Sequence, residues 1–377
     1  MGEPLDDMGT PLSPAAPSGW TWYAIEGAVC RDGSPTGFYV RKGPSDKLLI
    51  YLEGGGACSS PGFCDYNPAN VNQVLSGDGE TVAGSIGGAT AGRQQPGTAG
   101  IFDTAQADNP FKDWSQIYVP YCTGDVHFGT RMNVMVPGVS AGQQFVGYLN
   151  MKKFMSRIVP TFQAQVTRVV LTGASAGGFG ALLNYSMVQD AFGSALVSVL
   201  DDSGPSFPDN ARYMPTCLQK NWRELWGFKD SLPSDCSECM QADGGGLADF
   251  AKYLFRKHPN AGIGLVSSMQ DEVIRLFYSS GLQNCGSFTS ADPTTITLGQ
   301  LDETVYMPGA DYTAGLTEVR TKYAATGKFA TYYLGGANQT FHQHIWRSRF
   351  YAPSSGTQSI AAWVSKFLEG QLEQVGP

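Results

Sequence analysis

The chain has 377 residues, of which 42% are apolar and only 15% are charged, and its formal net charge is −8. This length is enough for one large domain with a sizeable core. No run of Lys or Arg is longer than a pair, so the basic footprint of a nucleic-acid-binding protein is missing. No stretch approaches 18 consecutive apolar residues, and the sequence therefore predicts no membrane span.

The N-terminal segment, MGEPLDDMGTPLSPAAPSG, is acidic and rich in Pro and Gly. It lacks the apolar core of a signal peptide. We expect residues 1–18 to form a flexible lead-in and residues 19–377 to form a single α/β domain.

Strand patterns and helix patterns follow one another along that domain. The predicted strands cover residues 20–28, 37–41, 47–52, 116–121, 166–171, 196–200, 262–266 and 329–334. The predicted helices cover residues 141–158, 178–191, 213–226, 247–256, 271–278, 313–326 and 359–368. From residue 116 onward the order alternates, which favours a doubly wound, mostly parallel sheet covered by helices on both faces.

Two segments interrupt this alternation. Residues 76–108 are rich in Gly, Ala, Ser and Thr and are longer than an ordinary connection. We expect them to form a mobile surface loop, with one wall of a cleft as the alternative. Residues 203–260 contain three cysteines and several helical stretches, which suits a small inserted cap.

The eight cysteines lie at positions 30, 58, 64, 122, 217, 236, 239 and 285. An even count in loop contexts favours four disulfides in a secreted, extracellular or periplasmic protein over buried thiols in the cytosol. Cys58 and Cys64 are the best local pair. Cys236-Ser-Glu-Cys239 also resembles a redox motif or half of a zinc site, but no second such pair or nearby His pair accompanies it, so we expect no metal.

The stretch Gly173-Ala174-Ser175-Ala176-Gly177 fits the pattern Gly-x-Ser-x-Gly. It follows the β-branched strand 166–171 and leads directly into a small-residue helix. In a nucleophile elbow the serine lies on a strained strand-to-helix turn, and residues two positions away must be small to avoid collision. The sequence therefore predicts Ser175 as a catalytic nucleophile.

Such a nucleophile needs backbone N–H groups that stabilise an oxyanion. One donor is the residue after the serine, here Ala176, and the other comes from the loop after an early strand. The strand 47–52 ends in Glu53-Gly54-Gly55-Gly56. We expect Gly55 and Gly56 to supply the other donors; a plain glycine turn is the alternative.

Three blocks within residues 47–64 and 109–185 resemble the pectin acetylesterase/Notum family of serine carboxylesterases. They are LIYLEGGGACSSPGFC, NPFKDWSQIYVPYCTGDVHFG and GASAGGFGALLNY, and the second half of the chain is similar only more loosely. The resemblance implies an α/β-hydrolase-like fold, an exported protein, a Ser-Asp-His triad and no cofactor.

Only four histidines are present, which narrows the choice of base. His258 stands at a helix end, and His127 precedes the serine, against the chain order Ser, Asp, His of this fold. His342 and His344 follow the last predicted strand, where the triad histidine belongs. His344-Ile345 is similar to the family's His followed by a small or apolar residue, so we expect His344 to be the base, with His342 near the substrate.

The resemblance also places the acid. The strand 262–266 runs into Ser268-Met269-Gln270-Asp271, similar to the family's Ser-x-x-Asp, so Asp271 is expected to orient the imidazole. The alternative is that Asp271 only stabilises the start of a helix, in which case Asp302 or Asp311 would serve. Asp125 and His127 are expected to contact substrate, with loop hydrogen bonding as the alternative.

By this resemblance the substrate is an acylated carbohydrate or small ester, first of all an acetyl ester of pectin. The acidic net charge argues against long, highly charged pectin and suits neutral or heavily esterified polymer. A lipid or longer-chain deacylase of the same family is one alternative, and a catalytically silent carbohydrate-binding relative is another. We expect a monomer.

Overall fold

The computed structural model describes residues 5, 8–13, 19–76, 88–282, 307–354 and 358–377, with side chains of 280–282 excepted. Its core is a nine-stranded sheet in the order β1-β2-β6-β3-β9-β10-β11-β12-β15. The β1·β2 and β2·β6 pairs are antiparallel and the other pairs are parallel. The prediction of a mostly parallel sheet is confirmed.

The bounds of the elements lie close to those expected for most of the chain. The sheet strands are β1 (Thr21–Val29), β2 (Pro35–Arg41), β3 (Lys47–Leu52), β6 (Ser115–Val119), β9 (Arg168–Ala174), β10 (Leu196–Asp202), β11 (Gly262–Ser268), β12 (Phe329–Leu334) and β15 (Gln374–Val375). The α-helices are α1 (Pro61–Tyr66), α3 (Gly147–Phe162), α4 (Ala176–Phe192), α5 (Thr216–Trp226), α6 (Phe228–Ser231), α7 (Phe250–Lys257), α8 (Glu272–Leu282), α9 (Gly309–Ala324) and α10 (Ile360–Leu368).

Small elements lie outside the sheet, and the sequence patterns did not predict them. They are the hairpins β4 (Gln73–Leu75) with β5 (Ala89–Ala91), β7 (Arg131–Val134) with β8 (Gln143–Phe145), and β13 (Pro353–Ser354) with β14 (Gln358–Ser359). Strand β8 occupies the start of the helix predicted over 141–158. None of the helices in the described part of the chain is long and apolar enough to cross a membrane.

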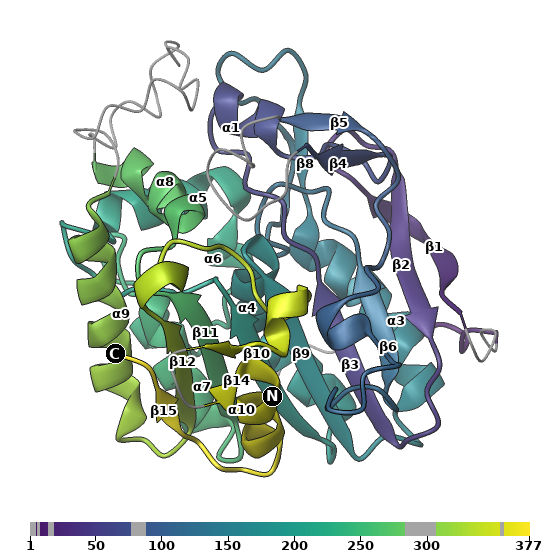
Figure 1. Cartoon of the computed structure of the whole chain (residues 1–377). Coiled ribbons are helices and arrows are strands. Elements are labelled where there is room, and N and C mark those ends of the chain that lie inside the picture. The colour runs from purple at the N-terminus through teal and green to yellow at the C-terminus, as the bar shows by residue number, and fades with distance from the viewer. Residues whose placement is uncertain (1–4, 6–7, 14–18, 77–87, 283–306, 355–357) are drawn as a thin grey trace.

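Helices cover both faces of the sheet (Figure 1). On β3, Leu48, Ile50 and Leu52 belong to the core cluster that contains residues of α3 and α4. Leu49 and Tyr51, which alternate with them, belong to the cluster that contains α10. This period of two is what a central strand buried on both faces requires.

The described part of the lead-in packs along α3. The amide of Leu12 donates to Oγ1 of Thr161 at 2.8 Å, and the amide of Gly9 donates to the carbonyl of Ser156 at 3.0 Å. Residues 1–4, 6–7 and 14–18, on which the prediction of flexibility also falls, lie outside the described residues.

The cysteines form disulfides between positions distant and near in sequence. Cys30 pairs with Cys122, Cys58 with Cys64, and Cys236 with Cys239, while Cys217 is also disulfide-bonded. The predicted local pair Cys58–Cys64 is confirmed. Cys236 and Cys239 form a bridge within the segment 203–260, which holds α5, α6 and α7.

Candidate active site

The carboxyl ends of the parallel strands place the predicted site residues at one edge of the sheet. The loop 53–56 follows β3, Ser175 follows β9, Asp271 follows β11, and the loop with both candidate histidines follows β12. Ligands of open α/β sheets bind outside this edge. The fold therefore brings these segments together as the sequence predicted.

Ser175 lies on a strained turn between β9 and α4. Its φ is 58° and its ψ is −123°, a conformation that non-glycine residues rarely adopt. A Cβ on Gly177 would lie 1.9 Å from the carbonyl oxygen of Leu52, and one on Gly173 would lie 2.3 Å from the carbonyl oxygen of Gly177. The glycines thus provide the steric clearance that a nucleophile elbow needs.

The glycine loop after β3 packs directly against the elbow. A Cβ on Gly54 would lie 2.4 Å from the carbonyl oxygen of Ala174 and 3.0 Å from Cβ of Ser175. Gly56 has a φ of +76°, which favours glycine. Gly56 and Ser175 line the same two cavities, so the loop and the serine border the same space.

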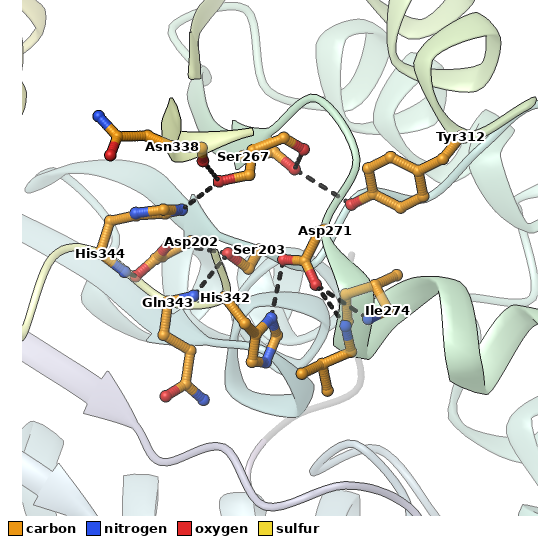
Figure 2. A network of polar contacts seen from close by, with 12 residues as sticks. Asp202, Ser203, Ser267, Asp271, Ile274, Tyr312, Asn338, His342, Gln343 and His344 are labelled. Atoms are coloured by element: carbon orange, nitrogen blue, oxygen red, sulfur yellow. Dashed lines mark hydrogen bonds and ion pairs between the residues drawn. The ribbon is translucent and has the colours of Figure 1, made fainter. Parts of the chain in front are cut away.

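Asp271 and His342 form the hydrogen-bonded pair of the site (Figure 2). Nδ1 of His342 lies 2.8 Å from Oδ2 of Asp271, and both side chains are almost fully buried. The other oxygen, Oδ1, accepts the amides of Val273 and Ile274 at 3.0 Å each. Asp271 therefore holds the start of α8 and the imidazole at the same time, so the two roles considered for it coexist.

His344 has a different environment, which corrects the expected pairing. Its Nε2 lies 3.2 Å from Oγ of Ser268, and its side chain is fully buried. Burial lowers the pKa of His344 well below its ordinary value, and the positive charge of Arg349 acts in the same direction. His342, by contrast, lines a cavity together with Ser175. The structure therefore places His342, and not His344, in contact with Asp271 and on the cavity that Ser175 lines.

Asp125 and His127 are buried and line neither of the two cavities that Ser175 lines. Asp125 accepts from Oγ1 of Thr123 and from the amide of Gly147, at 2.6 and 2.7 Å. Nε2 of His127 lies 2.8 Å from the carbonyl oxygen of Glu53. Burial lowers the pKa of His127 to about 4, so its neutral ring donates this hydrogen bond. The expected substrate contacts give way to the alternative, loop hydrogen bonding.

His258 and Asp311 have partners outside the group formed by Ser175, Asp271 and His342. His258 Nε2 is 3.1 Å from Oγ of Ser186 on α4, and Asp311 in the first turn of α9 pairs with Arg212. Asp302 lies outside the described residues.

Two cavities of different character meet at Ser175. The first has a volume of about 50 Å³ and is mostly apolar; its lining includes Ala176, Phe179, Trp222, Trp226, Phe277 and Tyr278. The second is larger, about 340 Å³, and more polar; its lining includes Glu53, Tyr66, Arg93, Gln94, His342 and Trp346. An ester bound with its carbonyl at Ser175 would thus have one part in an apolar space and the other in a polar one.

The polar cavity also revises the expectation for residues 76–108. Residues 93–95, 97 and 102 line it, so the described part of this segment forms a cleft wall, the alternative considered. Residues 77–87 lie outside the described residues.

Glu53 is an ionisable residue beside the candidate site that the sequence patterns did not identify. Its Oε2 accepts the amide of Tyr121 at 2.9 Å, and the residue lines the polar cavity. Burial raises the pKa of Glu53 to about 7, although hydrogen bonds from Tyr118 and Tyr121 oppose this shift. Its position beside the glycine triplet was the only signal in the sequence.

A serine elbow on a mostly parallel sheet, with an Asp-His pair beyond later strands, defines an α/β-hydrolase-like protein. Residues 21–375 match the model of the pectinacetylesterase family, and the chain belongs to this family.

Curated relatives are similar over about half of the chain. Palmitoleoyl-protein carboxylesterase NOTUM of Drosophila melanogaster is 27% identical over 222 residues, which cover 56% of this chain and 31% of that protein. Palmitoleoyl-protein carboxylesterase notum2 of Xenopus laevis is 28% identical over 229 residues, covering 56% and 43%. The human NOTUM protein is 28% identical over 197 residues, covering 50% and 36%. The matches span less than half the length of each of these relatives.

A solved structure of the Wnt deacylase Notum from Drosophila matches with a TM-score of 0.61 at 17% identity, covering 96% of both chains. This likeness shows the α/β-hydrolase fold of the family.

Proposed function

We propose that this protein is a carboxylic-ester hydrolase that forms an acyl-enzyme on Ser175. The observation that carries the proposal is the meeting of three features at one cavity: a strained serine, a glycine loop, and a histidine bonded to a buried aspartate. Family membership supports the same reaction class.

In the first step Oγ of Ser175 attacks the ester carbonyl and its proton moves to Nε2 of His342. Asp271 accepts the Nδ1–H bond, which fixes the tautomer and stabilises the imidazolium. Backbone N–H groups of Gly55, Gly56 and Ala176 stabilise the oxyanion. His342 then protonates the leaving alcohol, and water activated by His342 hydrolyses the acyl-enzyme.

The two cavities support an acetyl ester of a polysaccharide as the substrate. The apolar cavity of about 50 Å³ suits a short acyl group, and the polar cavity offers aromatic and amide side chains to a sugar. Arg93 and Arg347 also line the polar cavity. Their guanidinium groups give this wall a local positive charge, so the acidic net charge of the chain does not argue against a uronate polymer such as pectin.

A longer-chain deacylase is the second candidate. It is favoured by the mostly apolar lining of the first cavity, to which Trp222, Trp226 and Phe277 contribute. In either case the disulfides favour an oxidising compartment, extracellular or periplasmic, and we propose that the protein acts as a monomer.

A chain-length series of p-nitrophenyl esters, run beside acetate release from acetylated pectin and xylan, tests the proposal. We expect the highest kcat/KM for acetate and loss of activity in Ser175→Ala. A preference for acyl chains of eight or more carbons would favour the second candidate. Hydrolysis that survives Ser175→Ala contradicts the mechanism, and a wild type inactive on every ester points to a silent carbohydrate-binding relative.

A further inference from the structure

The side chains of Asp202 and Ser203 hold the loop that carries His342 (Figure 2). Asp202 is the last residue of β10 and is fully buried. Its Oδ2 accepts the amides of His344 and Ile345, at 2.6 and 2.9 Å. Oγ of Ser203 accepts the amide of Gln343 at 3.1 Å. The two side chains therefore bind three consecutive amides of the loop.

The same two residues also contact the other parts of the site. The carbonyl oxygen of Asp202 accepts the amide of Ser175 at 2.7 Å. The amide of Ser203 donates to the carbonyl of Val266 on β11, at 2.8 Å, and β11 leads to Asp271. Ser203 has a φ of 61° and Gln343 a φ of 64°. Such strained backbone persists where the surroundings over-determine it.

We propose that Asp202 is a positioning residue for the reaction: its carboxylate clamps the His342 loop to the elbow, and its negative charge stabilises the positive charge that forms on His342 during the reaction. The first part rests on geometry alone, and the second part rests on the proposed function. Asp202 does not have to touch substrate for either part.

The charges around Asp202 agree with this role. Titratable groups near it are Asp201 on its own strand, His342 and His344 on the loop, and Tyr51 on β3. Burial raises the pKa of Asp202 to about 6, against the hydrogen bonds from His344 and Ile345 and the charge of His342. As pH falls through about 6 the carboxylate becomes protonated, its hold on the two amides weakens, and activity should fall.

Asp201 is a matched control for Asp202. It lies on the same strand and is 3% exposed. Its side chain points toward α4, because a Cβ on Gly178 would lie 2.2 Å from Oδ1 of Asp201. Burial and the negative charge of Asp202 raise the pKa of Asp201 well above its ordinary value. Its change to Asn keeps the size and shape of the side chain.

Hydrogen–deuterium exchange tests the clamp without any need for activity. At pH 7.5 we expect peptides covering residues 342–347 to exchange at least roughly fivefold faster in Asp202→Asn than in wild type, since charge-assisted acceptors are stronger than neutral ones. Asp201→Asn should leave their exchange unchanged. Unchanged exchange in Asp202→Asn, or equal acceleration in both variants, would overturn the clamp.

The pH profile of kcat/KM tests the role of the charge. We expect Asp202→Asn to lower kcat with little change in KM, and to move the acid limb to lower pH by roughly half a unit or more, because a titrating negative charge is removed. Ser203→Ala should move the limb to higher pH, because Oγ of Ser203 donates to Oδ1 of Asp202 at 3.1 Å and stabilises its ionised form.

Different results would contradict the proposed function and the proposed role of Asp202. A wild type that hydrolyses no ester contradicts the proposed function and the role of the charge, while exchange still decides the clamp. An active wild type whose acid limb stays in place in both variants contradicts the role of the charge alone. If Asp202→Asn does not fold, Ser203→Ala tests both parts of the proposal. In this variant the amide of residue 343 must exchange faster than in wild type, and the acid limb of kcat/KM must move to higher pH.

Discussion

Nδ1 of His342 lies 2.8 Å from Oδ2 of Asp271, although 71 positions separate the two residues in sequence. The pair forms because β11 and β12 are parallel neighbours, and the segments after them leave the sheet at the same edge. The neighbouring His344 bonds to Ser268 instead. Two histidines two positions apart thus have separate hydrogen-bond partners.

The apolar cavity should limit the length of the acyl group. Trp222 lines this cavity but not the polar one. We expect Trp222→Ala to raise kcat/KM for hexanoyl and octanoyl esters relative to acetate by roughly tenfold, since each buried methylene is worth about 0.8 kcal/mol. The measurement is the p-nitrophenyl ester series.

Trp346 provides the matched control, because it lines only the polar cavity. Trp346→Ala should leave the chain-length profile of the small esters unchanged and raise KM for acetylated polysaccharide. If Trp346→Ala instead alters acyl preference, the assignment of the two cavities is reversed.

The clearance at the elbow should contribute to the stability of the fold. Gly177→Ala would place a Cβ 1.9 Å from the carbonyl oxygen of Leu52, and backbone on both sides would have to move. We expect a loss of about 3 kcal/mol or more in the free energy of unfolding, measured by urea denaturation. Gly62→Ala in α1, where a Cβ would meet nothing within 4 Å, should be neutral or slightly stabilising; equal losses in both variants would refute the steric argument.

The sequence predicted the elbow, the central strands and the place of Asp271 correctly. The elbow was predictable because its cause is local: Gly173 and Gly177 clear space that the turn itself removes. The bounds of β3 and β12 agree with the predicted ones because apolar runs mark central strands. Family likeness and chain order also placed Asp271 after β11, where it meets a histidine.

The remaining site residues depended on contacts between distant segments. Whether His342 or His344 meets Asp271 is decided by the path of the loop after β12, which Asp202 holds from a different strand. Asp125 and His127 are polar residues in a motif-like loop, yet each also bonds to a backbone group far along the chain. No pattern within the loop distinguishes such contacts from contacts with substrate.

Glu53 should make the stability of the protein fall as pH rises. Its pKa is about 7 in the folded protein against an ordinary value of 4.5, so between these values the folded state keeps a proton that the unfolded state has lost. The contribution of Glu53 to the free energy of unfolding is therefore complete below about pH 4.5 and declines until the pH passes about 7.

The isosteric change Glu53→Gln removes this titration. From pH 5 to pH 8 we expect the variant to gain about 2 kcal/mol in unfolding free energy relative to wild type, allowing for partial solvent contact. Glu373→Gln is the control: the hydrogen bonds from Lys366 lower the pKa of Glu373, so its contribution is constant over this pH range. A constant difference between Glu53→Gln and wild type would contradict the buried, protonated carboxyl.

The most direct test of the Ser175–His342–Asp271 arrangement is kcat/KM for p-nitrophenyl acetate in His342→Gln and His344→Gln, with the Tm of each variant measured alongside. We expect His342→Gln to lose roughly 10³-fold or more, since it removes the proton acceptor of the nucleophile. His344→Gln can keep a hydrogen bond to Ser268 and should lose less than about tenfold, the effect of a small change in positioning. Loss of activity in a folded His344→Gln, with His342→Gln still active, would contradict the proposal that His342 is the base for Ser175.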